Sequence, residues 1–472
     1  MSPLPGGIVS VKYCLVLIVA AVLCLLGDVR AASVSGVDAL VDTFMSEARI
    51  AGLSVAVMKG DVVVHARGYG LADVENAVPT TEHTVFRIAS LSKQFTAVSV
   101  LMLAEQGKID LDAGIRTYFP EFPATGPQPT VTQLLNHTSG FDFQPAWTAI
   151  MPPAETPPSV MHDLTSATLT TLFARATFEY TPGTKFRYNN NAFALLGLLI
   201  ERVSGVSYAS FVKTHIFDPL GMTESYYMDN ASIIRNRATG YTFRGPDVIN
   251  ANVPNSNGLY SAGGLGSTAL DLMTWRRALT SSRLISEASS KRMTTPGRLT
   301  DATPIPYGLG LFLLNLDGRP KIDHYGNTTG FRSEIAYYPT DQLTVVVLSN
   351  TNPARTDVLE SRISRMLMSM PEPAVTEVAM TPDALRPYAG TYLVTDARIS
   401  HRSVVTEITW KPDGLYAGAF RLRPIGHDVF VPIGDPNHHY TFAMRNGQPH
   451  GLVVEREGRI IADANRTSAS AP

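Results

Sequence analysis

The sequence predicts an α+β fold, in which an antiparallel sheet flanked by helices is followed by a small all-β domain. Two apolar strand pairs joined by tight turns, at 52–70 and 335–350, are separated by several helical segments. After Met370 the composition changes, and short strand-like segments alternate with Gly, Asp and Asn turns to the end of the chain. With 472 residues, the chain exceeds the size at which one hydrophobic core stops growing.

The first 31 residues have the features of a secretory signal peptide. Lys12 precedes the apolar run YCLVLIVAAVLCLL, and the small residues of GDVRAAS offer a cleavage site after Ala31 or Ala32. The run is shorter than the roughly 20 residues of a membrane span, although retention as an N-terminal anchor stays open. Both cysteines, Cys14 and Cys24, lie here, which excludes a disulfide scaffold, a Cys nucleophile and thiolate metal sites in the mature chain. We expect a periplasmic or secreted protein without a stable membrane span once the signal is cleaved.

The charge balance excludes some classes of partner. A formal net charge of −2 and the lack of any long Lys/Arg run argue against nucleic-acid binding, which requires a basic excess. A charged fraction of 17% is that of an ordinary globular protein, and we see no internal repeat of fixed period.

The first elements of the folded part are a helix and a hairpin. Val37, Leu40, Val41 and Phe44 recur at helical spacing and predict an amphipathic helix. The segment GLSVAVMKGDVVVHARGYG then predicts a β-hairpin that turns at Lys59–Asp61. The next helix, TAVSVLMLAEQGKI, ends at the glycine in that segment.

The middle of the chain predicts loops and apolar helices. Asp110, Asp112 and Gly114 are interpreted as turn residues, because no acidic residue closes a calcium loop at the right distance. The Pro-rich residues 142–176 predict either a lid over a cleft or a surface insert with one helix. Three further helices are expected in NAFALLGLLIERVSG, in YASFVKTHIFDPLGM up to Pro219, and in the end of SAGGLGSTALDLMTWRRAL.

Two four-residue patterns could carry a serine nucleophile. A serine hydroxyl attacks only when a base within hydrogen-bonding reach takes its proton, and helical i, i+3 spacing supplies that reach. Ser90 and Lys93 in RIASLSKQFTAV meet the condition, and so do Ser210 and Lys213 in YASFVKTHI. The lysine must also be buried or lie beside a cation to release its proton near neutral pH.

Other polar residues distinguish the two patterns. FRYNNNAF offers Tyr188 and Asn190 before an apolar helix, where a phenol can shuttle a proton and an amide can orient a carbonyl. DHYGNTTGF offers His324 and Gly326 at the start of a strand pair, where glycine permits close approach of the main chain to a ligand. Ser210 has no such partners in order, and we interpret it as solvated helix surface.

The three motifs Ser-x-x-Lys, Tyr-x-Asn and His-x-Gly, in this order, resemble the serine β-lactamase and penicillin-binding protein family. The resemblance is nearest to its class C and D-Ala-D-Ala carboxypeptidase-like branch, and it covers roughly residues 38–368. Connecting segments are also similar, including QLLNHTSGF, FEYTPGTKFRYNNNAFALLGLLIERVSG, FDPLGM and SAGGLGSTALDLMTWRRAL. The resemblance implies the β-lactamase/transpeptidase-like fold, an antiparallel sheet flanked by helices plus an all-helical subdomain. The predicted parts are therefore a signal peptide at 1–31, a hydrolase domain at 32–370, a linker at 371–387 and a small β-barrel or sandwich at 388–472.

Carried over residue by residue, the resemblance implies a catalytic group of three. Ser90 would be the acylated nucleophile, Lys93 its proton partner, and Tyr188 the general base and acid. The alternative for Tyr188 is a polar turn before a helix.

The resemblance also implies the substrate-binding residues. Asn190 would contact the substrate amide, and the N–H groups of Ser90 and Asn327 would form the oxyanion hole beside Gly326. His137 and Ser139 in NHTSG are expected to shape the edge of the cleft. The adjacent His438 and His439 point apart on a strand and predict no metal site.

The third motif departs from the family's usual Lys-Thr-Gly or Lys-Ser-Gly. Here it is His324-Tyr325-Gly326, and an unperturbed imidazole titrates at about pH 6.5, so that much of the cationic charge that attracts a β-lactam carboxylate is absent at neutral pH. His324 is expected to bind substrate, with a satisfied strand-end histidine as the alternative.

The predicted function is that of an exported serine hydrolase acting through an acyl-serine intermediate on amides or esters, most of all a D-amino-acid peptidase of carboxypeptidase type or an esterase. The alternatives are a true class C-like β-lactamase and a catalytically inactive cell-wall, penicillin-binding protein. We expect a small-molecule or peptide substrate, with peptides derived from peptidoglycan as one source. We expect no cofactor, metal or nucleic-acid partner.

Overall fold

The computed structural model describes most of the chain from residue 36 onward. The described ranges are 36–122, 126–142, 166–175, 177–229, 231–244, 247–252, 260–373, 375–397, 405–418, 420–433, 435, 437–456 and 459–469. The predicted signal peptide and the greater part of the predicted lid, 143–165, lie outside them. Within the described ranges, no single helix is both long and apolar enough to cross a membrane.

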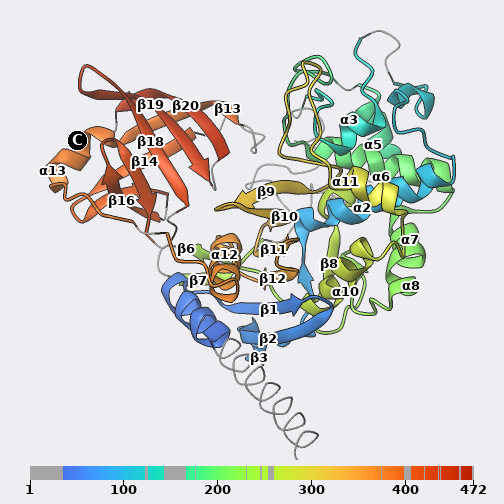
Figure 1. Cartoon of the computed structure of the whole chain (residues 1–472), viewed down its shortest axis with the longest axis horizontal. Coiled ribbons are helices and arrows are strands. Elements are labelled where there is room, and N and C mark those ends of the chain that lie inside the picture. The colour runs from blue at the N-terminus through green and yellow to red at the C-terminus, as the bar shows by residue number, and fades with distance from the viewer. Residues whose placement is uncertain are drawn as a thin grey trace, which may run out of the picture.

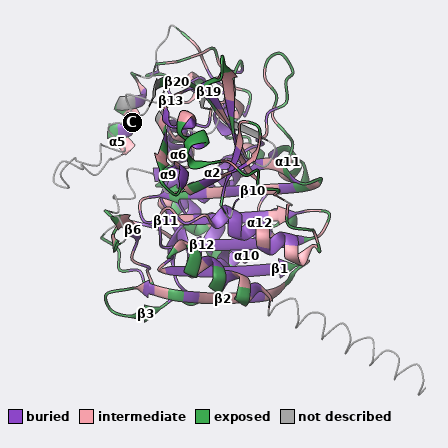
Figure 2. Cartoon of the chain, turned by 90° about the vertical axis from the view of Figure 1, so that its left-hand side faces the viewer, coloured by how far each residue is buried: buried purple, intermediate pink, exposed green. Residues whose placement is uncertain are grey.

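A seven-stranded antiparallel sheet forms the centre of the larger domain (Figure 1). Its strands, in spatial order, are β3 (Val78–Pro79), β2 (Val62–Asp73), β1 (Gly52–Lys59), β12 (Leu343–Ser349), β11 (Phe331–Tyr338), β10 (Arg319–Thr328) and β9 (Phe312–Leu316). The two predicted hairpins are present as β1–β2 and β11–β12, and they meet where β1 pairs with β12. Figure 2 shows that β1 and β12 are buried along nearly their whole length.

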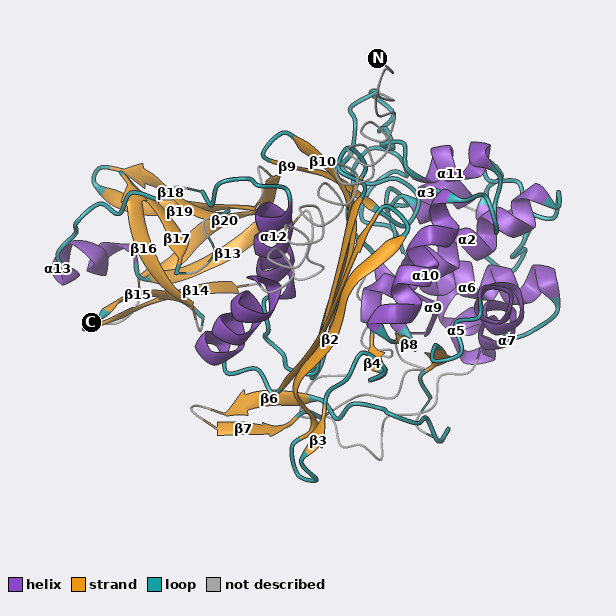
Figure 3. Cartoon of the chain, turned by 60° about the horizontal axis from the view of Figure 1, so that its bottom comes forward, coloured by secondary structure: helices purple, strands orange, loops and turns teal. Residues whose placement is uncertain are grey.

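Helices cover both faces of the sheet, and the alternation of side chains along β1 separates two cores. Val55 and Val57 pack with residues 36–48, which are helical, and with α12 (Thr356–Leu367). Ala56 and Met58 point the other way, into the larger core. The helices of that larger core include α2 (Ser92–Glu105), α6 (Asn190–Ser204), α9 (Tyr260–Gly263) and α10 (Ala269–Thr280). Figure 3 shows the sheet edge-on between these two helical layers.

The remaining elements complete the helical subdomain and its connections. They are β4 (Phe86–Arg87), η1 (Ala89–Leu91), η2 (Ile115–Thr117), α3 (Val131–Leu135), α5 (Ser166–Phe173), α7 (Tyr208–Val212), η4 (Lys213–Phe217), α8 (Asp218–Leu220), β5 (Tyr226–Tyr227), β6 (Tyr241–Arg244), β7 (Asp247–Asn250), β8 (Leu265–Ser267) and α11 (Glu287–Met293).

The helix expected to stop at Pro219 ends one residue later, at Leu220. α7, the π-helical turn η4 and α8 are contiguous, and Pro219 lies in the first turn of α8, where no intrahelical N–H is needed. The C-cap is Gly221, whose φ of 70° is left-handed and favours glycine.

The C-terminal part is a closed antiparallel barrel, which decides between the predicted barrel and sandwich. Its strands are β13 (Gly390–Ala397), β14 (Val405–Lys411), β15 (Gly414–Ala417), β16 (Phe420–Gly426), β17 (Val429–Pro432), β18 (His438–Arg445), β19 (Gln448–Arg456) and β20 (Arg459–Ala469). Apolar side chains that include Tyr392, Leu415, Phe430 and Phe442 fill its interior. The predicted linker contains a short helix, α13 (Pro382–Leu385), followed by η6 (Arg386–Tyr388).

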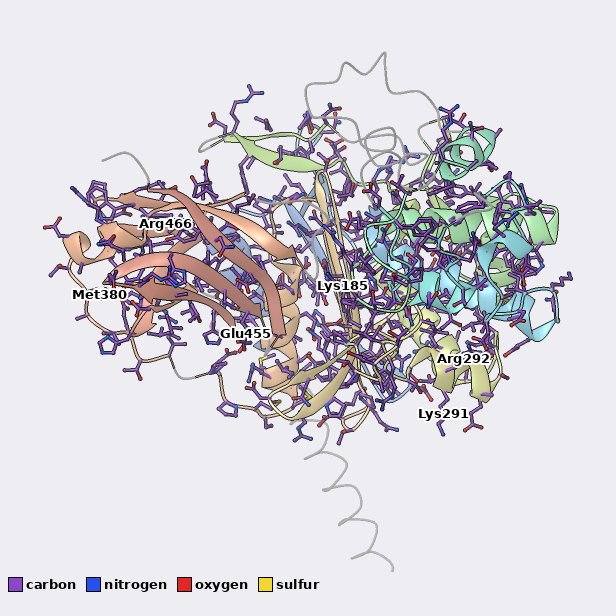
Figure 4. The ribbon with its side chains drawn as sticks, turned by 90° about the horizontal axis from the view of Figure 1, so that it is seen from above. Lys185, Lys291, Arg292, Met380, Glu455 and Arg466 are labelled. Atoms are coloured by element: carbon purple, nitrogen blue, oxygen red, sulfur yellow. The ribbon has the colours of Figure 1, made fainter. Side chains whose placement is uncertain are left out.

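The barrel lies beside α12, at the opposite end of the molecule from the helical subdomain. Figure 4 shows Glu455 and Arg466 on the barrel and Lys291 and Arg292 on α11, far apart across the sheet. Arg355, immediately before α12, forms ion pairs with Asp357 and with Asp435 of the barrel. The ion pair between Arg355 and Asp435 links the two domains.

Candidate active site

The turn that carries Ser90 is held by a strand of the sheet. Ser90 lies in η1 just before α2, and the preceding Ala89 has a φ of 46°, an unusual conformation for a residue with a side chain. A Cβ added to Gly326 of β10 would lie 2.2 Å from the carbonyl oxygen of Ile88, so only glycine lets the strand approach this closely. Ser333 of β11 donates a hydrogen bond of 2.8 Å to the same carbonyl. The contacts of β10 and β11 with Ile88 therefore fix the position of the turn that carries Ser90.

Lys93 occupies a fully buried position directly beneath Ser90. Its Nζ lies 3.0 Å from Ser90 Oγ, 2.7 Å from Asn190 Oδ1 and 2.8 Å from the carbonyl oxygen of Ala262. Burial lowers the pKa of Lys93 well below its usual value. The two carbonyl oxygens can only accept, so a neutral amine gives them its two N–H groups and keeps its lone pair for the Ser90 hydroxyl. The arrangement is that of a base poised on a serine.

Tyr188 closes the other side of Ser90. Lys93 Nζ lies 4.8 Å from the centre of the Tyr188 ring, and the tyrosine exchanges a side-chain hydrogen bond with Ser90. Burial raises the pKa of Tyr188 well above its usual value. The free protein therefore holds Tyr188 as a protonated phenol, which is able to give a proton to a leaving group.

His137 is a support for Tyr188. It has a φ of 61°, its ring lies 4.2 Å from the Tyr188 ring, and its Nδ1 accepts a hydrogen bond of 3.1 Å from the N–H of Asn189. Asn189 in turn caps α6 by accepting from the N–H of Ala192. Both His137 and Ser139 are buried, and their expected role at the edge of the cleft stays a prediction.

His324 lies near this group but does not present a charge to it, and its expected contact with substrate stays a prediction. The side chain is fully buried, its Nδ1 lies 2.8 Å from the carbonyl oxygen of Tyr325, and its Nε2 lies 2.9 Å from the hydroxyl of Tyr307. A carbonyl only accepts, so Nδ1 carries the proton and Nε2 accepts from Tyr307. Burial, together with Lys93, lowers the pKa of His324 to about 3. The His324 imidazole is therefore neutral, has one fixed tautomer, and forms part of the buried wall of the site behind Tyr188.

Two aromatic residues complete the wall, and sequence patterns did not single them out. Tyr307 is fully buried, and its ring packs edge-on against Tyr188 at 6.3 Å. Phe312 stacks on Tyr188 at 6.0 Å and on the half-buried Tyr325 at 5.7 Å. The available signal was YGLGLF, a tyrosine in a glycine-rich turn that opens a strand. Gly310 of that turn approaches the carbonyl oxygen of Lys93, where an added Cβ would lie at 3.0 Å.

The Beta-lactamase family is matched over residues 37–365, which is well over half of the chain. The protein belongs to the β-lactamase family and is a serine hydrolase. It is 29% identical to a D-aminopeptidase of Gluconobacter oxydans over 420 residues, which are 88% of this chain and 75% of that protein. It is 30% identical to penicillin-binding protein 4* of Bacillus subtilis over 324 residues, which are 66% of this chain and 70% of the relative.

Solved structures show the same fold. The octameric penicillin-binding protein homologue of Pyrococcus abyssi superposes with a TM-score of 0.66 at 24% identity, covering 91% of this chain and 99% of that one. The D-amino acid amidase of Ochrobactrum anthropi in complex with D-phenylalanine superposes with a TM-score of 0.61 at 22% identity, covering 72% and 99%. At this identity, the likeness concerns the fold alone.

The second Ser-x-x-Lys pattern of this β-lactamase family member lies on the surface. Lys213 is exposed and binds Asp218 Oδ1 and Oδ2 at 2.7 and 2.8 Å. The hydroxyl of Ser210 accepts a hydrogen bond from Ser207 at 2.8 Å. The structure thus pairs Lys213 with a carboxylate, where Lys93 contacts a serine.

Asn327 follows Gly326 at the exposed end of β10. Strand β9 pairs with β10 only as far as Asp323, so beyond that residue β10 has a strand neighbour on the β11 side alone. The side-chain oxygen of Asn327 accepts a hydrogen bond of 3.1 Å from Asn352. An oxyanion hole made by the N–H groups of Ser90 and Asn327 stays a prediction. Among the described residues, no three His, Cys, Asp or Glu side chains gather as metal ligands would.

Proposed function

We propose that this protein hydrolyses amide bonds next to D-amino acid residues through an acyl-Ser90 intermediate, and small esters by the same route. The observation that carries the proposal is the buried Lys93 amine, bound by two carbonyl oxygens and 3.0 Å from Ser90 Oγ. A relative in sequence that is a D-aminopeptidase supports D-amino acid amides as the first substrate class.

The geometry supports a two-step mechanism. Lys93 takes the hydroxyl proton while Ser90 Oγ bonds to the substrate carbonyl carbon, and the developing oxyanion is stabilised by backbone N–H groups. The C–N bond then breaks as Tyr188 gives its proton to the departing amine and regains one from Lys93. Water hydrolyses the acyl-serine by the reverse proton transfers, releasing the carboxylic acid. In the free protein, the raised pKa of Tyr188 favours Lys93 as the first base.

The third motif supports amidase or esterase activity over efficient β-lactam hydrolysis. The residue at the usual lysine position, His324, is buried and neutral, and the side chain beside it is the bulky Tyr325. A β-lactam carboxylate would therefore meet a phenol where most family members have a cation and a small hydroxyl residue. We expect acylation by penicillin to be slow.

A panel of substrates tests the proposal. D-Phe-p-nitroanilide, a D-Ala-D-Ala peptide, p-nitrophenyl acetate and nitrocefin would be compared for wild type and Ser90→Ala, with the L-Phe anilide as the stereochemical control. We expect Ser90-dependent release from the D-anilide and the ester, and a fluorophosphonate adduct on the Ser90 peptide by mass spectrometry. Turnover of nitrocefin alone would instead identify a true β-lactamase. An adduct without any turnover would identify a penicillin-binding protein, and an adduct on Ser210 would refute the assignment.

We also propose export, on the strength of the N-terminal sequence. A charged residue, a short apolar run and small residues before Ala32 are the features of a signal peptide. Expression in a bacterial host with N-terminal sequencing of the periplasmic fraction tests it. A mature chain beginning near Ala32 is expected, and a full-length, membrane-bound product would mean an uncleaved anchor. Export would place peptidoglycan-derived D-amino acid peptides within reach.

A further inference from the structure

A second pocket lies on the face of the sheet opposite the helices that carry Ser90. Its volume is about 250 Å³, and its walls come from the end of the helix at 36–48, from β6, from α12 and the residues before it, and from the barrel. Figure 3 shows α12 between the sheet and the barrel, while α2 lies on the far side of the sheet. The pocket is therefore separate from the site already described.

The floor and walls of this pocket are aromatic. Phe44, Phe243 and Phe420 line it from the N-terminal helix, β6 and β16. At its edge, Ile433 is 55% exposed, although most large apolar side chains of the described residues are covered. Phenyl rings that meet across a domain boundary form the kind of apolar surface on which a small organic side chain packs.

Charged groups of both signs surround this apolar surface. Arg49 lies over the Phe243 ring, with its guanidinium carbon 4.9 Å from the ring centre. Arg362, half-buried on α12, and Glu47, exposed on the N-terminal helix, also line the pocket. Guanidinium groups recognise carboxylates in a bidentate way, and a carboxylate recognises an ammonium group.

Arg355 also lines the pocket, but its guanidinium is held by other protein groups. Its guanidinium forms ion pairs with Asp357 and Asp435 and lies 5.5 Å from the Phe420 ring centre. Those contacts tie the barrel to α12 and so fix the far wall of the pocket. Arg362 and Glu47 are the charged groups that can face a ligand, beside Arg49 over the Phe243 ring.

We propose that this pocket binds a free amino acid or dipeptide with an apolar side chain. The side chain would pack among the three phenylalanines, the carboxylate would meet Arg362, and the ammonium group would meet Glu47. The pocket, at about 250 Å³, admits a molecule the size of phenylalanine. The proposed reaction releases molecules of this class, so the pocket would be a product site between the barrel and the hydrolase domain. The role as a product site, unlike the binding itself, rests on the proposed function.

Binding is tested on the full chain carrying Ser90→Ala, because turnover then plays no part. Isothermal titration with D-phenylalanine, phenylacetate and phenethylamine separates the contributions of the two charges. We expect saturable binding of phenylalanine, with about tenfold weaker binding when either charged group is missing, as the loss of one charge-assisted hydrogen bond predicts. An equal affinity for all three compounds would overturn the zwitterion assignment.

Variants locate the binding. Arg362→Gln and Phe243→Ala, each added to Ser90→Ala, should weaken phenylalanine binding by about tenfold or more, while Arg362→Lys should retain part of it. Arg244→Gln is the matched control, because Arg244 is an exposed neighbour on β6 that does not line the pocket. With Ser90 intact, all of these variants should keep the ester-hydrolysis rate of wild type. Binding that survives both Arg362→Gln and Phe243→Ala would belong to the Ser90 site and would refute the pocket. Failure of hydrolysis in wild type would leave this binding result unaffected.

Discussion

The hydrogen bond between Tyr307 and His324 makes a sharp prediction, because both side chains are fully buried. Tyr307→Phe removes one hydroxyl oxygen and leaves His324 Nε2 as a buried acceptor without this donor. Leaving a buried polar group unsatisfied costs about 1–3 kcal/mol. The free energy of unfolding should fall by about that amount, because the phenyl ring still fills the same space.

The same substitution should slow catalysis. The His324 ring centre lies 6.0 Å from that of Tyr188, and without the Tyr307 hydroxyl the imidazole loses its hydrogen bond at Nε2 and keeps the one between Nδ1 and the carbonyl oxygen of Tyr325. If about 1.4 kcal/mol of that cost appears in the transition state, kcat/KM falls about tenfold. The change should be mainly in kcat, since both side chains are fully buried in the free protein.

Urea unfolding followed by tryptophan fluorescence, and kcat and KM for p-nitrophenyl acetate, measure both effects. Tyr226→Phe is the control, because it deletes a hydroxyl that donates to the carbonyl of Thr223 at the surface, and it should change neither quantity. Wild-type stability and wild-type kcat in Tyr307→Phe would refute the account of His324 as a neutral, fixed acceptor.

Three further predictions follow from other contacts. Gly326→Ala places a Cβ 2.2 Å from the carbonyl oxygen of Ile88, so ester hydrolysis should fall at least about a hundredfold and the melting temperature should drop. Because the folded-state pKa of His324, about 3, lies below its unfolded value, stability should be complete above about pH 6.5 and fall by about 1.4 kcal/mol per pH unit toward pH 3; His324→Gln should reduce that slope in acid unfolding curves. Asp435→Asn weakens the ion pair with Arg355, so limited proteolysis should release the barrel sooner, whereas Asp413→Asn at an exposed barrel turn should not.

The sequence predicted most of the fold because local periodicity and turns carry that information. The β1–β2 and β11–β12 hairpins, the apolar helix α6 and the Ser90–Lys93 spacing are all properties of neighbouring residues. The β-lactamase family itself was visible from three short motifs and the segments that connect them.

What escaped prediction depends on tertiary contacts. Burial lowers the pKa of His324 and keeps it neutral, and Tyr307, on a separate loop, donates to its Nε2; neither fact is encoded near residue 324. The pocket at Phe243 arises from segments hundreds of residues apart.

The buried amine of Lys93 has a cost that the fold as a whole must carry. An amine, enclosed by Phe193 and the Tyr188 ring, occupies space that an unbranched apolar side chain would fill at no penalty for desolvation. Lys93→Met should therefore give a protein with a higher melting temperature and no hydrolytic activity. Selection for thermal tolerance alone would drive this protein away from activity, so any effort to stabilise it must screen for turnover at the same time.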